Sequence, residues 1–134
     1  MNKILALLLA CLFLIGSIVS AGDLSVVNVV NPSAGNPGSA VSGSFQVQNT
    51  GVNALSGIVF IKSDLTHTTD PTSKILSSAV TFNPASIAAL NAGQTSSLIS
   101  SNVALPQFTK PGPYSGNVEA RDNTGAHSSV FVLN

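Results

Sequence analysis

The sequence predicts an all-β fold, a single antiparallel β-sandwich of about seven strands that follows a cleaved signal peptide. Apolar and polar residues alternate with a period of two over most of the chain after residue 21, which is typical of half-buried strands. Glycine, proline, asparagine and aspartate interrupt this alternation about every 8–12 residues, as the turns of a sandwich do. The only cysteine is Cys11, in the signal segment, so no disulfide can staple a smaller module together. A complete sandwich core is therefore expected.

Residues 1–21 have the layout of a secretory signal, and residues 22–134 form the predicted mature domain. A short basic start precedes an apolar run over residues 4–19, and small residues lead up to Ala21, where a signal peptidase would cut. Two alternatives fit less well. A lipobox ending at Cys11 would leave apolar residues behind it, and a membrane anchor needs about 20 apolar residues, more than this run supplies. We expect a secreted, extracellular protein with no membrane attachment after cleavage.

The first two strands are predicted for residues 24–30 and 41–48. Residues 24–30 are rich in valine, and the Pro- and Gly-rich residues 31–38 that follow form a turn-rich connection. The cleanest alternation of the chain builds one face of the second strand from Val41, Gly43, Phe45 and Val47. The first strand either pairs within the domain or adds to the sheet edge of a neighbour; sequential strands usually pair, which favours the first alternative.

The middle of the chain is expected to hold two further strands. Residues 55–61 predict a third strand that is apolar on both faces, so we place it in the centre of a sheet or under cover on both sides. Residues 63–73 are interpreted as a polar loop, and residues 75–82 as a short strand that ends before Pro84. Residues 87–90 are brief and lie beside a turn, which favours a single helical turn or a bend.

Three strands complete the prediction. Residues 95–103 form a Ser-rich strand, and residues 106–113 a proline-rich crossing. Residues 114–121 alternate as a strand, residues 122–125 carry the chemistry of a hairpin turn whose final glycine can take a positive φ, and residues 126–133 close the sheet. Seven short strands in about 110 residues are typical of an immunoglobulin-like β-sandwich.

Three short segments occur in a suggestive order and spacing. They are residues 45–51 (FQVQNTG), residues 90–95 (LNAGQT) and residues 111–118 (PGPYSGNV), the last followed by Ala120, Asp122 and Gly125. Over residues 40–133 the chain resembles extracellular Ig-like modules of the CARDB and NEW3 type, which share a V-x-N-T-G strand end, an L-x-x-G-x-T strand entry and a closing hairpin of this pattern. The resemblance implies a non-catalytic module that serves adhesion, spacing or carbohydrate association.

The charge of the chain excludes several classes of function. Only 7% of the residues are charged, against about 25% in typical domains, and the formal net charge is zero. No basic patch can form, so we expect neither nucleic-acid binding nor electrostatic attachment to a membrane surface. The many Ser, Thr, Asn and Gln residues leave little charge repulsion between copies, which is compatible with self-association as well as with a neutral soluble domain.

Candidate reactive groups are sparse. Asp64, His67 and Asp70 lie three residues apart in the predicted polar loop and are candidate ligands of a divalent cation. Calcium loops supply more carboxylates and zinc needs three or four close ligands, so a solvated loop whose aspartates cap turns is favoured. His127 lies near Asp122 and abundant serines, but no nucleophile elbow is present and sequence does not show triad geometry. We expect no cofactor and no enzymatic activity.

Two aromatic residues are candidates for a structural or binding role. Tyr114 is the only tyrosine, and a tyrosine at the start of a late strand of an Ig-like sandwich can hydrogen-bond back across the sandwich corner; contact with a ligand is the alternative. Phe108, in the proline-rich crossing, is the best candidate for an exposed ring. With no tryptophan in the chain, an aromatic platform for sugars would depend on it.

Two functions therefore remain. The first is a non-catalytic secreted Ig-like protein that acts in adhesion, extracellular matrix or surface assembly through contacts with other extracellular proteins or with itself. Low charge and unpaired sheet edges motivate it, since an edge can template strand addition. The alternative is a module that binds polysaccharide or cell wall.

Overall fold

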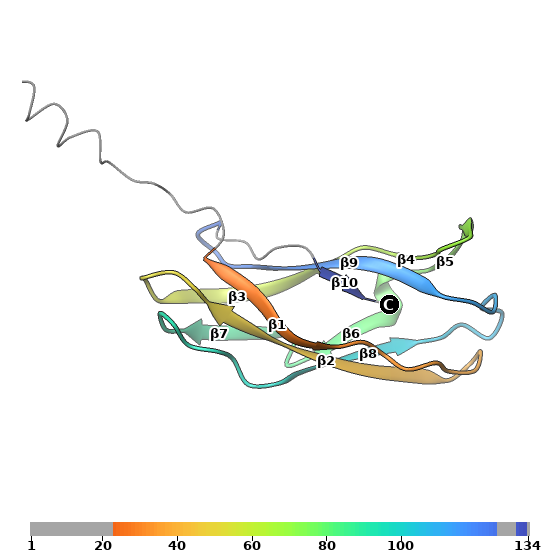
Figure 1. The fold of residues 1–134 in the computed structure, drawn as a ribbon, viewed down its shortest axis with the longest axis horizontal. Helices are drawn as coiled ribbons and strands as arrows, with labels where there is room; N and C mark the ends of the chain where they lie inside the picture. Colours follow the sequence, from red (N-terminus) through yellow and green to blue (C-terminus); the bar gives the residue numbers. More distant parts are fainter. Residues whose placement is uncertain (1–22, 126–130, 134) are drawn as a thin grey trace, which may run out of the picture.

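The computed structural model describes residues 23–125 and 131–133, which form two packed layers of strands (Figure 1). In that part of the chain the strands are β1 (Leu24–Val30), β2 (Ala40–Asn49), β3 (Leu55–Lys62), β4 (Leu65–His67), β5 (Asp70–Ile75), β6 (Val80–Asn83), β7 (Ser86–Leu90), β8 (Ile99–Ala104), β9 (Tyr114–Arg121) and β10 (Phe131–Leu133), with a 3-10 turn, η1 (Ser77–Ala79), before β6. The predicted signal segment lies outside the described residues. Within them, no helix is long and apolar enough to cross a membrane.

The strand order is that of an immunoglobulin-like sandwich, as predicted. One sheet has the order β1-β2-β8-β6. In the other sheet β9 lies between β3 and β10, and β7 pairs with the other edge of β3. Strand β4 also pairs with β9, and β5 pairs with β4. All of these pairs are antiparallel. Strands β1, β2, β8 and β6 correspond to A, B, E and D of the Ig fold, and β3, β9 and β10 to C, F and G. Strand β1 pairs with β2 of the same chain.

The prediction of a polar loop over residues 63–73 is wrong, because this segment holds β4 and most of β5. Strand β4 pairs with β9 through Thr66 and Ser115, and with β5 through Leu65 and Ile75. Leu65 and His67 are buried while Thr66 is only partly so, but three residues are too few for this alternation to stand out in the sequence. The two strands exist because β9 supplies hydrogen-bonding partners that lie far away along the chain.

Two neighbouring predictions also need correction. Residues 75–82 do not form one strand: the chain leaves β5 at Ile75, makes the turn η1 and resumes as β6. The Ser77 amide donates to the Asp64 carboxylate at 2.7 Å, and this bond holds the interruption in place. Residues 87–90 form neither a helical turn nor a bend but belong to β7, because β3 pairs with the segment along its length.

Strand β3 is central, as predicted, but it is not covered on both sides. It pairs with β7 along one edge and with β9 along the other. Leu55 and Ile58 are buried, whereas Val59 and Ile61 point outward and are exposed. Gly57 has a φ of 63° and breaks the alternation, so that buried positions are three residues apart rather than two.

The last strands follow the prediction with shorter bounds. Strand β8 begins at Ile99 rather than at residue 95, and before it only an isolated bridge joins Thr95 to Gln48. Strand β9 has the predicted bounds, and Gly125 in the following turn has the expected positive φ, 92°. Of the predicted closing strand, β10 is described and pairs with β9; residues 126–130, which include His127, lie outside the described residues.

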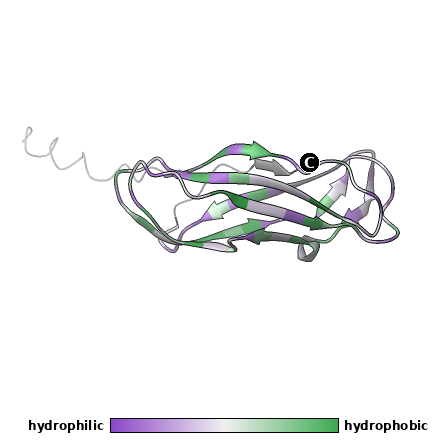
Figure 2. Cartoon of the chain, turned by 90° about the horizontal axis from the view of Figure 1, so that it is seen from below, coloured by the Kyte–Doolittle hydropathy of each residue, from purple (hydrophilic) through white to green (hydrophobic). Residues whose placement is uncertain are grey.

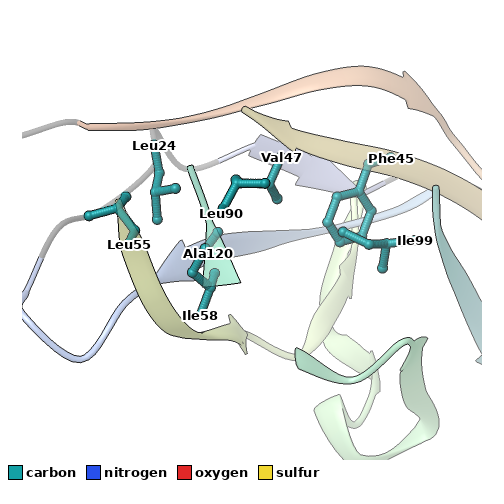
Figure 3. Close-up of a cluster of buried hydrophobic side chains, with 8 residues drawn as sticks. All are labelled: Leu24, Phe45, Val47, Leu55, Ile58, Leu90, Ile99 and Ala120. Atoms are coloured by element: carbon teal, nitrogen blue, oxygen red, sulfur yellow. The ribbon is translucent and has the colours of Figure 1, made fainter. Parts of the chain in front are cut away.

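The core lies between the sheets in two adjoining clusters. Eight buried side chains form the larger cluster (Figure 3), and they are Leu24, Phe45, Val47, Leu55, Ile58, Leu90, Ile99 and Ala120. The second is built on Leu65, Ile75, Val80, Val103 and Val118. The rings of Phe45, Phe60 and Phe82 join the two, with each pair of centroids 5.4 Å apart in edge-to-face geometry. Hydrophobic and hydrophilic residues follow one another along the strands (Figure 2), as expected for strands with one face on the core and the other in solvent.

Candidate functional site

Two long connections meet at one end of the sandwich and form the candidate site. Residues 31–39 join β1 to β2, and residues 105–113 join β8 to β9; both loops lie at the right-hand end of Figure 1. The Gly38 amide donates to the Leu105 carbonyl at 3.0 Å, and the Leu105 amide donates to the Ser39 carbonyl at 2.8 Å. These two bonds tie the loops together although they are far apart in the sequence.

Between the loops lies a pocket of about 620 Å³, which we call the end pocket. The described residues that line it are Pro32, Ser33, Ala34, Gly35, Asn36, Pro37, Val41, Leu65, Ile75, Val103, Leu105, Thr109, Lys110, Pro111, Gly112, Pro113 and Tyr114. Leu65, Ile75 and Val103 belong to the second core cluster and form the floor, so the pocket is continuous with the core. Its volume lies within the roughly 300–1,000 Å³ of ordinary ligand sites.

Tyr114 holds the second loop through its hydroxyl group. The hydroxyl donates to the Lys110 carbonyl at 3.1 Å, four residues upstream, and lies 2.8 Å from the Ser73 hydroxyl. A tyrosine at the start of strand F that bonds to backbone just upstream is the tyrosine corner of Ig-like sandwiches. Because Tyr114 also lines the end pocket, the corner fixes one of its walls.

His67 supports the same loop from β4, where it is buried. Its Nδ1 accepts a hydrogen bond from the Thr69 amide at 3.2 Å, so the ring hydrogen is on Nε2. Nε2 donates to the Pro111 carbonyl at 3.0 Å. The imidazole also packs edge-to-face on Tyr114, with ring centroids 5.0 Å apart. The ring therefore anchors the pocket wall rather than facing solvent as a ligand or base.

Asp70 contributes a third tie from the start of β5. Its carboxylate lies 2.7 Å from the Lys110 ammonium and accepts bonds from the amide and hydroxyl of Thr72. The ammonium of Lys110, and then Thr72, hold the pKa of Asp70 well below its usual range. Lys110 is exposed and Asp70 partly exposed, so the role of the ion pair is to neutralise the Lys110 charge at the pocket rim more than to add stability.

The loop candidates for a metal site do not form one. The Asp64 carboxylate accepts the Ser77 amide. His67 bonds to Pro111, and Asp70 to Lys110. Over residues 23–125 and 131–133, no group of three or more His, Cys, Asp or Glu side chains could hold a metal ion.

Phe108 is the most exposed large apolar side chain of the described residues, at 95%. It lies in a turn in which the Thr109 amide donates to the Pro106 carbonyl at 3.1 Å and the Thr109 hydroxyl reaches the same oxygen at 2.6 Å. The backbone under the ring is thus held in one conformation. Phe108 belongs to the same loop as the pocket wall but does not line the end pocket.

The sequence predicts one wall of this site but not the other. Phe108 lies within residues 105–113, and three other candidates, Tyr114, His67 and Asp70, bond to this loop; Asp64 bonds to Ser77 instead. For the wall from residues 31–39 the sequence predicts only a turn-rich connection; its prolines are the signal that points to the pocket, because prolines from both loops line it. Nothing in the sequence indicated that these two segments face each other.

The motifs at 45–51 and 90–95 meet at the opposite end of the sandwich. Asn49 is fully buried there, and its side-chain amide donates to the carbonyls of Asn53 at 2.8 Å and Leu90 at 3.0 Å. Its side-chain oxygen accepts the Gly51 amide at 2.9 Å. These residues hold loops together, which accounts for both motifs without a ligand.

Comparison with known proteins supports the fold alone. No family model and no curated protein matches the chain. Among solved structures, the ASH/PapD-like domain of human CEP192 (PapD-like domain 7) has a TM-score of 0.51 and 12% identity over 84% of this chain and 82% of that chain. A family 123 glycoside hydrolase from Clostridium perfringens has a TM-score of 0.49 and 15% identity over 74% of this chain, which spans 22% of that protein.

Proposed function

We propose that this chain is a non-catalytic secreted Ig-like protein that acts in adhesion, extracellular matrix or surface assembly through protein–protein contacts. Its partners are other extracellular proteins or further copies of itself. The observation that carries the proposal is Phe108, an almost fully exposed ring on a turn whose backbone is held in place.

An exposed ring in this setting suits a contact residue. Leaving an aromatic side chain in water forgoes the roughly 1.5–3 kcal/mol that its burial would yield. Aromatic residues are enriched at interface centres, where a few of them carry most of the binding energy. Because the turn already orders the backbone around Phe108, this loop loses little further conformational entropy when a partner covers the ring.

The test compares Phe108→Ser with Val52→Ser. Val52 is 90% exposed in the loop after β2, at the end of the sandwich away from the end pocket, so it controls for loss of an exposed apolar side chain. Two measurements are made on the purified full chain: self-association by sedimentation velocity, and retention of labelled protein on the cells that produce it. We expect Phe108→Ser to weaken the contact at least about tenfold and Val52→Ser to leave it unchanged.

The outcomes separate the candidate functions. Protein contacts are supported if self-association is lost in Phe108→Ser. They are also supported if the cells retain wild type but not Phe108→Ser, and protease treatment of the cells abolishes this retention. Equal loss in both variants, or a strict monomer that no cell retains, overturns the proposal.

The alternative is a module that binds carbohydrate or cell wall, and the same exposed ring favours it because an aromatic face can stack on a sugar. Retention would then survive protease treatment, be displaced by soluble polysaccharide and disappear in Phe108→Ser. Retention that no polysaccharide displaces would eliminate this alternative.

A further inference from the structure

We infer that the end pocket is a binding site for a small, uncharged, apolar molecule. This inference is independent of the proposed protein contacts, because Phe108 lies outside the pocket lining. It rests on three properties of the pocket: the chemistry of its walls, the absence of an unpaired charge among the described lining residues, and the bonds that fix the positions of the walls.

The walls are mostly hydrocarbon. Leu65, Ile75 and Val103 form the floor, and four prolines stand in the two loops above it, at positions 32, 37, 111 and 113. Proline has no amide hydrogen, so these loops present apolar rings without leaving a backbone donor unpaired in the pocket. The neutral polar side chains in the lining, such as Ser33 and Asn36, can hydrogen-bond to a hydroxyl or carbonyl group.

The charge of the lining selects against ions. Lys110 is the only charged side chain among the described lining residues, and its ammonium already lies 2.7 Å from the Asp70 carboxylate. A ligand carboxylate or phosphate would have to compete with Asp70 for this ammonium. An ionised group taken into such a pocket loses its hydration without gaining a partner of its own. The favoured ligand is therefore uncharged.

The pocket is also held open before any ligand arrives. The loops are joined by the Gly38–Leu105 and Leu105–Ser39 backbone bonds, and the second loop is tied to the sandwich through Tyr114 and His67. These bonds fix the two loops relative to each other and to the sandwich. A ligand consequently finds a preformed site, which reduces the entropy that binding would otherwise lose.

The test uses the neutral apolar dye N-phenyl-1-naphthylamine, whose fluorescence rises on transfer from water to an apolar site. The full chain is titrated as wild type, as Leu105→Trp, in which the larger side chain fills the pocket, and as Leu98→Trp. Leu98 is an exposed leucine outside the lining and provides the matched control. All three proteins carry the apolar residues 4–19, so dye bound there cancels in the comparison.

We expect saturable binding to wild type and Leu98→Trp, and at least about a tenfold loss of affinity in Leu105→Trp. Leu105→Ala, which enlarges the pocket, should bind the dye at least as well as wild type, which shows that a change at this position does not by itself destroy the site. Equal affinity in Leu105→Trp and Leu98→Trp overturns the site. So does a wild type that shows no saturable binding of the dye.

The chemical class is tested by displacement. Octan-1-ol and octanoate have the same chain length and differ in charge. We expect octan-1-ol to displace the dye at a concentration at least about tenfold lower than octanoate does, because the carboxylate finds no unpaired cation. Equal or stronger displacement by octanoate overturns the assignment to an uncharged ligand.

Discussion

Gly112 is the position at which a single methyl group should most disturb the candidate site. Its φ is 135°, a region that residues with a side chain rarely adopt, and a Cβ built there would lie 2.2 Å from Nε2 of His67. The imidazole is buried and bonded to the Pro111 carbonyl, so it cannot move away without breaking that bond. Gly112→Ala therefore carries a backbone penalty and a packing penalty together.

The magnitude follows from these two penalties. Holding a residue other than glycine in a sparsely populated backbone region costs about 1–3 kcal/mol. Displacing the ring leaves buried polar atoms unpaired, which costs about another 1–3 kcal/mol. We expect Gly112→Ala to lower the free energy of unfolding by about 3–4 kcal/mol, a large share of the roughly 5–15 kcal/mol available to a domain.

Gly38→Ala is the matched control for the backbone penalty. Gly38 also has a positive φ, 79°, in the other pocket loop, but a Cβ there would meet nothing within 4 Å. It should cost only about 1–2 kcal/mol. Urea denaturation followed by circular dichroism measures both losses, provided that the slope of the unfolding free energy against urea concentration is the same in all variants.

A second substitution separates contact from conformation. In the double variant His67→Ala/Gly112→Ala the ring is gone, so the combined loss should be smaller than the sum of the single losses by about 1–2 kcal/mol. If Gly112→Ala and Gly38→Ala cost the same and the double variant is additive, the contact with His67 does not constrain the loop and the reasoning fails.

Three further predictions concern stability. Tyr114→Phe removes the bonds to the Lys110 carbonyl and the Ser73 hydroxyl and should lower the free energy of unfolding by about 1–2 kcal/mol. An unchanged urea midpoint would show that the tyrosine corner does not stabilise the domain. The folded-state pKa of Asp70 lies well below its ordinary value of 3.8, so its contribution to stability is complete above about pH 4 and declines as the pH falls toward the folded-state pKa. Asp70→Asn should be less stable than wild type at pH 6, and a stability gap that does not narrow between pH 6 and pH 2 would refute this. The hydroxyl of Ser101 is buried without a hydrogen-bond partner among the described residues, so Ser101→Ala should raise thermal stability by about 1 kcal/mol, and a clear loss would point to an unseen partner.

The main strands could be predicted because burial with a period of two is a local property. The bounds of β1 and β9 follow from it, as does the inward face of Phe45 and Val47 in β2. The turn at residues 122–125 was equally visible, because only glycine takes its positive φ without strain. The same reasoning allowed cover on both faces of β3, but Val59 and Ile61 are exposed.

The short strands could not be predicted from their own residues. Strand β4 has three residues, and β7 contains two alanines that do not favour a strand. Each forms because a distant strand offers a ladder of hydrogen bonds, β9 to the first and β3 to the second. Local propensity carries no information about such a partner.

The sequence by itself determined an all-β sandwich with few charges, one tyrosine at a strand start and an aromatic residue in a proline-rich loop. Only the tertiary structure decided that residues 31–39 face residues 105–113 and enclose a pocket with them. It also turned His67 inward and paired Asp70 with Lys110. The physical reason is that alternation reports which side of a strand is buried, whereas a site at the end of a sandwich depends on which loops the sheet topology brings together.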